Sequence, residues 1–199
     1  GNPGFVEPDP SYHGLRYWEA LGPGAFAVKL RVQGLRDMGP AISPFNAFLL
    51  LQGLETLSLR MQKHTQNAQA LAEWLSERDE VEAVHYAGLP SSPWNSLAQK
   101  YLPRGAGAVV SFELRGGVEA GRAFVEGVEL FSHLVNIGDV RSLIAHPAST
   151  THSQLTPEEQ LLTGVTPGLV RLAVGIEDVE DLKADLNAGF RAAKAAQEK

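Results

Sequence analysis

The amino-acid sequence predicts an α+β fold, in which short antiparallel or mixed strands form a sheet with helices on one face. Two observations support this class. Residues 24–78 carry helical spacing almost throughout, whereas residues 81–195 alternate between runs of strand period and runs of helical period. A long helical stretch therefore leads into a region of alternating elements.

Length and composition limit the possible functions. At 199 residues the chain fits one domain, or one domain and a segment of another. The net charge of −6 argues against a general nucleic-acid or anionic-membrane binder, and the absence of cysteine excludes disulfides and thiolate metal sites. Residues 45–51 form the longest apolar run, which is too short to span a bilayer. We therefore expect a soluble, cytoplasmic protein without nucleic-acid or membrane partners.

The first 24 residues predict irregular, extended backbone, because prolines and turn-forming residues are dense there. The same stretch holds four aromatic side chains that are costly to expose together, namely Phe5, Tyr12, Tyr17 and Trp18. A disordered leader is the alternative, although disordered segments are poor in aromatic residues. We expect a connection inside a larger body.

Two helical segments follow. The first spans residues 24–37. The second begins at Ser43, the expected N-cap, and continues to residue 78 with Gly53 as the expected break. Its first half is apolar nearly all round, as in a buried helix, and its second half is amphipathic. This change of character predicts a domain boundary at about residue 60.

The remaining elements alternate along the chain. Strands are predicted at residues 81–86, 107–114, 132–137, 142–146 and 169–175, and helices at residues 96–102, 117–127 and 157–162. A final helix is expected from Asp178, its N-cap, to about Ala195, with Leu182, Leu186 and Phe190 facing inward.

One arginine lies inside the last predicted strand. Val170, Leu172 and Val174 alternate with Arg171, so the guanidinium should lie on the face opposite these apolar side chains. A partly buried arginine needs an anion, and its planar donors suit a carboxylate. An internal salt bridge and a ligand site both remain open at this point, and structural ion pairs are the commoner case.

Other chemistries find little support in the sequence. The six histidines show no metal-ligand spacing, and no phosphate-binding glycine loop or activated-nucleophile motif is present. The lysines lie beside polar residues, and none has the apolar setting that activates a Schiff-base amine. Glu177 and Asp178 are interpreted as helix-capping residues. A carboxylate-binding arginine is therefore the main chemical candidate.

Several separated motifs occur in one order along the chain: FVEPDPSYHG at 5–14, RVQGLR at 31–36, SPFNAF at 43–48, GLETL at 53–57, GAGAVVSFEL at 105–114, NIGD at 136–139, HPASTTH at 146–152 and RLAVGIE at 171–177. Together they resemble the C-terminal part of the Cys/Met-metabolism family of pyridoxal-phosphate enzymes. Within that family they are most similar to the O-acetylhomoserine sulfhydrylase branch.

The resemblance implies a fragment in two parts. Residues 1–60 would be the tail of the large cofactor-binding domain with its linking helix, and residues 61–199 the small C-terminal α/β domain of a fold-type-I enzyme. In such enzymes the arginine that matches Arg171 holds the substrate's α-carboxylate. Asn136 stands where γ-lyase-type members have serine, and Thr151 lies near the same site. We expect these three residues to bind substrate.

The resemblance also implies that the catalytic groups lie elsewhere. The family's Schiff-base lysine and its cofactor-binding residues correspond to positions upstream of Gly1. No catalytic, cofactor-binding or metal-binding residue is therefore assigned, and pyridoxal 5'-phosphate is not expected on the fragment itself. The parent enzyme would replace the acetate of O-acetyl-L-homoserine by sulfide, giving homocysteine for methionine biosynthesis, as a homodimer or homotetramer.

Two kinds of alternative remain open. Within the family, the parent could be an O-succinylhomoserine sulfhydrylase, a cystathionine γ-synthase or a γ-lyase, and Asn136 in place of serine favours the acetyl branch. Outside enzymology, the chain could act as a free-standing interaction or assembly domain.

Overall fold

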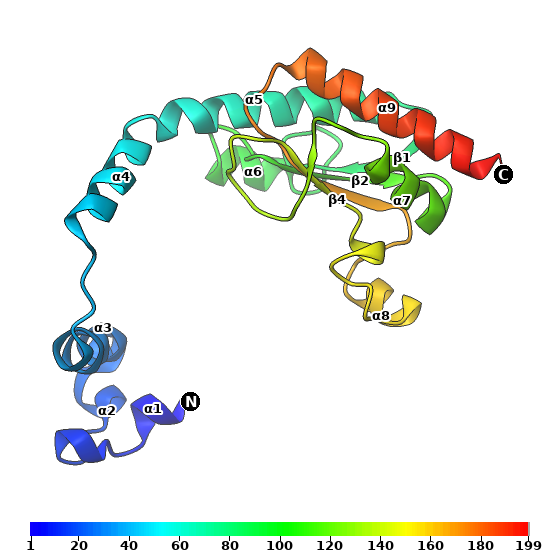
Figure 1. Cartoon of the computed structure of the whole chain (residues 1–199). Coiled ribbons are helices and arrows are strands. Elements are labelled where there is room, and N and C mark those ends of the chain that lie inside the picture. Colours follow the sequence, from blue (N-terminus) through cyan, green and yellow to red (C-terminus); the bar gives the residue numbers. More distant parts are fainter. Residues whose placement is uncertain (199) are drawn as a thin grey trace. The chain divides into compact units, whose positions relative to one another are not determined.

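The computed structural model describes residues 1–198, and the chain divides into two compact units, Gly1–Gly53 and Leu54–Lys199 (Figure 1). The first unit is entirely helical and the second carries a five-stranded sheet. The assignment of residues 1–60 and 61–199 to two domains of a larger enzyme remains a prediction. None of the helices among residues 1–198 combines the length and apolar character needed to cross a membrane.

The first unit begins with short helical turns rather than the predicted irregular backbone. These are α1 (Pro3–Val6), η1 (Pro10–Tyr12), α2 (Tyr17–Leu21) and η2 (Gly22–Gly24). Proline lies in the first turn of three of them, where its fixed φ favours a helix, and the side chains of Asn2 and Asp9 cap α1 and η1. The prediction of extended backbone was wrong because proline, which interrupts a helix in its interior, is favoured in the first turn of a helix.

The aromatic side chains of this unit are only partly collected into a core. Tyr17 is fully buried, and the Lys29 ammonium lies 4.6 Å from its ring centroid while pairing with Asp9 at 3.3 Å. Trp18 remains 55% exposed. The predicted helix at residues 24–37 is confirmed as α3 (Ala25–Lys29) and η3 (Leu30–Met38), the latter wound as a π-helix.

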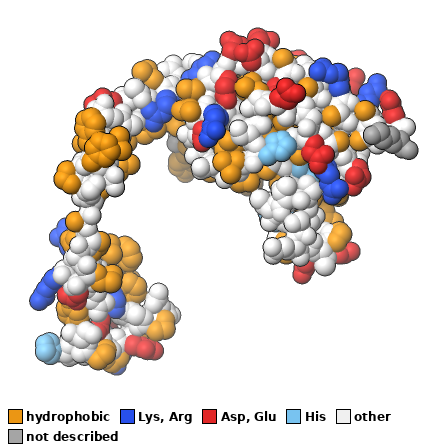
Figure 2. All heavy atoms as spheres, viewed as in Figure 1, with side chains coloured by type: hydrophobic (Ala, Val, Ile, Leu, Met, Phe, Trp, Pro, Cys, Tyr) orange, Lys and Arg blue, Asp and Glu red, His pale blue; other side chains and the backbone are white. Residues whose placement is uncertain are grey.

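The apolar helix α4 (Pro44–Glu55) begins as predicted, since the Ser43 hydroxyl accepts a hydrogen bond from the amide of Asn46 at 3.1 Å. Two expectations for it were wrong. None of its residues is buried and Phe45 is 67% exposed; Figure 2 shows hydrophobic side chains at the surface of this helix. The break falls at Thr56 rather than Gly53, because one glycine costs a helix only about 1 kcal/mol.

The second unit has a single sheet with strand order β1-β2-β5-β4-β3. Its strands are β1 (Val81–His85), β2 (Val109–Leu114), β3 (Ser132–His133), β4 (Leu143–Ala145) and β5 (Leu169–Ala173). All neighbouring pairs are antiparallel except β3 with β4, which is parallel. Its helices are α5 (Leu57–Ser76), α6 (Asn95–Tyr101), α7 (Gly117–Glu126), the 3-10 turn η4 (Pro147–Ser149), α8 (Pro157–Leu162) and α9 (Val179–Gln197).

Helices α5, α7 and α9 cover one face of this sheet, and α5 and α9 run along the same side in Figure 1. The core between them contains Phe112 of β2, Phe124 of α7 and Phe190 of α9, with the Phe124 and Phe190 ring centroids 4.9 Å apart. The predicted α+β class, with helices on one face of a mixed sheet, is confirmed.

The third predicted strand is much shorter than expected. Only Ser132 and His133 pair, in parallel with β4, and residues 134–141 leave the sheet as a loop. This loop carries Leu134, Val135 and Ile137, whose side chains are about half exposed or more. The composition of residues 132–137 therefore predicts a strand, but only the first two of these residues pair with a neighbouring strand.

Candidate functional site

Arg171 lies on the central strand of the sheet, on the face opposite the core that α5, α7 and α9 form. On β5 its flanking residues Val170 and Leu172 are fully buried toward the helices, whereas Arg171 is only partly buried. In register it pairs with Ser111 of β2 and Ala145 of β4. Paired residues point to the same face, so the guanidinium lies on the side away from that core, as the alternation of the strand predicts.

The guanidinium of Arg171 has no carboxylate partner among residues 1–198. Its one hydrogen bond there runs from Nη2 to the backbone oxygen of Asn136 at 3.4 Å, which is long for such a bond. Glu113, two residues beyond Ser111 on the same face, bonds Thr166 and His85 instead. The internal salt bridge left open by the sequence is therefore not formed by these residues, and most of the arginine's donors stay available.

Asn136 lies in the loop after β3, with its backbone oxygen toward Arg171. Its side-chain oxygen accepts a hydrogen bond from the amide of Ile137 at 2.8 Å, and its amide nitrogen makes none within residues 1–198. Farther along the loop, Asp139 accepts a bond from the amide of Arg141 at 3.0 Å, which lowers the pKa of the Asp139 carboxyl. The residue whose backbone oxygen contacts Arg171 thus also carries a side-chain amide that donates no hydrogen bond within residues 1–198.

Thr151 lies on a second loop, and the structure gives it no bond to Arg171 or Asn136. Its hydroxyl pairs with Nδ1 of His152 at 2.8 Å, and the residue is exposed. With Leu134 and Val135 it lines a small cavity of about 110 Å³. Thr151 therefore lies beside the segment that leads into Asn136, whereas Asn136 and Arg171 are brought into direct contact.

The loop with Thr151 is anchored by His146, which is fully buried. Its Nε2 donates to the backbone oxygen of Pro167 at 2.8 Å, and its Nδ1 pairs with the Ser149 hydroxyl at 2.8 Å. Burial lowers the pKa of the His146 imidazole. A neutral ring that bonds at both nitrogens positions this loop, and no group of three or more potential metal ligands occurs among the described residues.

Glu177 has a different role from the predicted helix cap. Asp178 is the N-cap of α9, as predicted, because its Oδ1 accepts from the amide of Glu180 at 2.8 Å. The Glu177 carboxylate instead accepts two bonds from Ser142, at 2.6 Å from the amide and 2.8 Å from the hydroxyl. Sequence reasoning missed this contact between Glu177 and Ser142. The one sequence signal of buried polar groups near it was a pair of polar residues, His64 and Asn67, on the buried side of an amphipathic helix.

The lysines bear on the expectation that this chain holds no catalytic or cofactor-binding residue. None of the lysines within residues 1–198 is buried, and Lys29 and Lys183 are engaged by Asp9 and Glu180. The absence of a Schiff-base lysine from this chain stays a prediction.

Comparison with known proteins decides the family. The model of the Cys/Met metabolism PLP-dependent enzymes matches residues 21–191. The chain belongs to this family. Pyridoxal phosphate is the cofactor of the family's enzymes, and the fold is that of the corresponding part of a fold-type-I enzyme.

Three relatives illustrate the relationship. The O-acetyl-L-homoserine sulfhydrylase of Leptospira meyeri is 54% identical over 196 residues, which cover 94% of this chain and 44% of that protein. A putative O-acetylhomoserine (thiol)-lyase of Campylobacter jejuni, solved with N'-pyridoxyl-lysine-5'-monophosphate, is 42% identical with a TM-score of 0.79, over 95% of this chain and 45% of the other. Cystathionine γ-synthase of Xanthomonas oryzae pv. oryzae, in complex with cystathionine, is 46% identical with a TM-score of 0.70. This match covers 80% of this chain and 41% of the other. This chain therefore spans less than half the length of these relatives.

Proposed function

We propose that this chain is the part of a PLP-dependent O-acetyl-L-homoserine sulfhydrylase that binds the substrate's α-carboxylate, and that it is not active alone. Arg171 holds the carboxylate through its planar donors, and the side-chain amide of Asn136 supplies a further neutral donor. Thr151 contributes from the neighbouring loop. The complete enzyme replaces acetate by sulfide, and it works in the cytoplasm as a homodimer or homotetramer.

One observation carries this proposal. Arg171, partly buried on the sheet face opposite the helical core, has no acidic partner within residues 1–198, although burying a cation without an anion is unfavourable. A substrate carboxylate would supply that anion. Its orientation by two loops and a strand would fix the amino acid relative to the reacting groups, which is a large source of rate enhancement.

The choice of substrate rests on one residue and on sequence identity to a relative. Asn136, in place of the serine of γ-lyase-type members, favours the acetylhomoserine branch, as does the identity to the Leptospira meyeri enzyme. The likeness to a cystathionine γ-synthase keeps that activity as an alternative within the family, together with O-succinylhomoserine sulfhydrylase and γ-lyase.

The experiment is a product balance with the full-length gene product and added pyridoxal phosphate. We expect acetate and homocysteine in equal amounts from O-acetyl-L-homoserine and sulfide, and a higher kcat/KM than with O-succinyl-L-homoserine. Cysteine in place of sulfide tests the γ-synthase, and omission of any thiol tests the γ-lyase. Absence of acetate release from O-acetyl-L-homoserine would overturn the proposal.

A matched sample of the isolated 199-residue chain tests the assignment of catalysis to upstream residues. We expect an intact mass that corresponds to 199 residues, no protein-bound pyridoxal absorption once added pyridoxal phosphate has been removed by dialysis, and no product. A protein-bound absorption band that survives dialysis would contradict this assignment, because one of the chain's own lysines would then hold the cofactor.

The exposed apolar side chains of α4 favour a second candidate, an interaction or assembly domain without catalysis. Phe45, Phe48 and Leu51 are each more than half exposed, a pattern typical of an interface. Analytical ultracentrifugation of the chain separates the two cases. A defined oligomer supports assembly, whereas heterogeneous aggregation indicates an interface that the full-length protein covers.

A further inference from the structure

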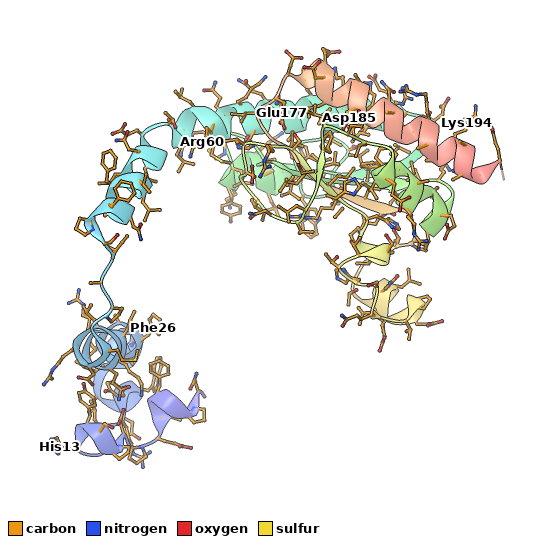
Figure 3. All side chains as sticks on the ribbon, viewed as in Figure 1. His13, Phe26, Arg60, Glu177, Asp185 and Lys194 are labelled. Carbon is orange, nitrogen blue, oxygen red and sulfur yellow. The ribbon has the colours of Figure 1, made fainter. Side chains whose placement is uncertain are left out.

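A buried polar cluster lies where β5 ends, outside the sheet face that carries Arg171. Three of its side chains are almost inaccessible to solvent, with His64 at 1%, Asn67 at 2% and Ser142 at 0% exposed. The fourth member, Glu177, is partly buried (Figure 3). Buried polar groups are costly unless they are hydrogen-bonded, so the bonds within this cluster should be specific and well defined.

The central contact of this cluster joins Glu177 to Ser142. Both oxygens of the Glu177 carboxylate are used, one by the Ser142 amide at 2.6 Å and one by its hydroxyl at 2.8 Å. The same hydroxyl accepts a bond from the amide of Gly175 at 2.8 Å. Ser142 is the last residue before β4, so these bonds hold the end of the loop that begins after β3.

Helix α5 fixes the other side of the cluster. The Asn67 amide donates to the backbone oxygens of Gly175 and Glu177, at 3.1 and 2.8 Å. Nδ1 of His64 lies 2.6 Å from the backbone oxygen of Val174. The backbone of residues 174–177 is therefore held by a long, well-packed helix and cannot shift without breaking several bonds.

The loop is also fastened directly to this backbone. The amide of Ile176 donates to the backbone oxygen of Val140 at 3.0 Å. Gly175 makes the close approach possible, because a Cβ at that position would collide with Glu177 Oε2 and with the backbone oxygen of Val140. The segment 136–142 is thus tied at its end to residues 175–177, which follow β5, the strand that carries Arg171.

We propose that Glu177 is a positioning residue, which sets the loop that carries Asn136 against Arg171 and so determines affinity for the substrate's α-carboxylate. The inference rests on the proposed function and deepens it. A partly buried carboxylate that serves one serine is a poor stabiliser compared with apolar packing, and in some proteins such groups instead fix one conformation. Loss of the two hydrogen bonds between Glu177 and Ser142 should make the loop mobile at the point where Arg171 contacts the backbone oxygen of Asn136.

The test compares Glu177→Ala, Glu177→Gln and the control Glu180→Gln in the full-length protein. Glu180 lies close by in sequence, but its carboxylate is exposed and pairs with Lys183. In Glu177→Ala we expect amide hydrogen exchange in residues 136–142 to rise at least about tenfold. We expect KM for the acyl-homoserine to rise about 10- to 100-fold at a temperature where the variant is folded, with a much smaller change in kcat. Glu177→Gln keeps one acceptor oxygen, so its exchange rate and its KM should lie between those of Glu177→Ala and wild type.

The outcomes separate the inference from the proposed function. Faster exchange confined to the loop, together with a raised KM that Gln partly restores, supports the inference. Unchanged exchange overturns it, as does faster exchange with an unchanged KM, because Glu177 would then serve stability alone. If wild type has no activity on any acyl-homoserine, the proposed function fails and the affinity part of the inference fails with it, while the exchange comparison still decides whether Glu177 holds the loop.

Discussion

The two faces of the sheet are built from alternating residues of the same strands, yet they differ in almost every physical respect. On one face Phe112 and Leu172 are fully buried against α5, α7 and α9. On the other, their neighbours Ser111 and Arg171 are partly exposed and pair with each other in register. The contrast teaches that adjacent residues can carry stability and binding separately, because strand side chains alternate between faces.

The largest expected effect on stability comes from the covered face. Phe112→Ala removes a fully buried ring that contacts Phe124 edge-on, with ring centroids 5.5 Å apart, and leaves a cavity. We expect the free energy of unfolding to fall by about 3–5 kcal/mol, measured by urea denaturation. The adjacent Ser111→Ala, on the opposite face, should change it by about 0.5 kcal/mol or less. Equal losses in the two variants would remove the distinction between the faces.

The reverse pattern is expected for the arginine of the opposite face. Arg171→Ala should weaken substrate binding by about 2–5 kcal/mol, the range for a desolvated charge that loses its partner, with little loss of stability. Titration of the full-length protein with substrate measures the binding. Arg122→Ala is the control, because Arg122 is exposed on α7 and its nearest ion pair, with Glu119, is 3.9 Å long. Normal binding by Arg171→Ala would contradict the carboxylate assignment.

A side chain of α9 offers a smaller test of the covered side. Asp185, labelled in Figure 3, accepts bonds from three consecutive backbone amides, of residues 129–131, at 2.8 to 3.0 Å. Asp185→Ala should lower the free energy of unfolding by about 2 kcal/mol, because these amides lose a charged acceptor. Asp181→Ala, an exposed carboxylate on the same helix, should have a much smaller effect. An equal loss of unfolding free energy in the two variants would show that water replaces Asp185 as the acceptor for these amides without a loss of stability.

The smallest expected effect is a pH dependence from His146. Its pKa is lowered by burial, so below the ordinary value of 6.5 the unfolded chain binds more protons than the folded chain, and stability falls as pH drops from 7 to 5. One such group contributes at most about 1.4 kcal/mol per pH unit. His146→Gln should flatten the measured slope of unfolding free energy against pH, because the group with the lowered pKa is removed. An unchanged slope in His146→Gln would show that the ring titrates normally when folded.

Much of this molecule follows from local sequence patterns. The strand at Arg171, its alternation, and the N-caps Ser43 and Asp178 could be predicted, because each depends on residues only a few positions apart. The same local patterns misjudged α4, which is apolar all round but exposed within residues 1–198, since burial depends on what else packs against a helix.

The tertiary structure decided the points that depend on distant partners. Sequence alone determined that an arginine would lie on the face opposite the apolar side chains of its strand. Only the folded chain could show that no acid within residues 1–198 reaches it, and that Glu177 bonds Ser142, 35 residues away, rather than capping a helix. Periodicity reports the direction of a side chain, whereas its partner is set by loops and helices that meet only after folding.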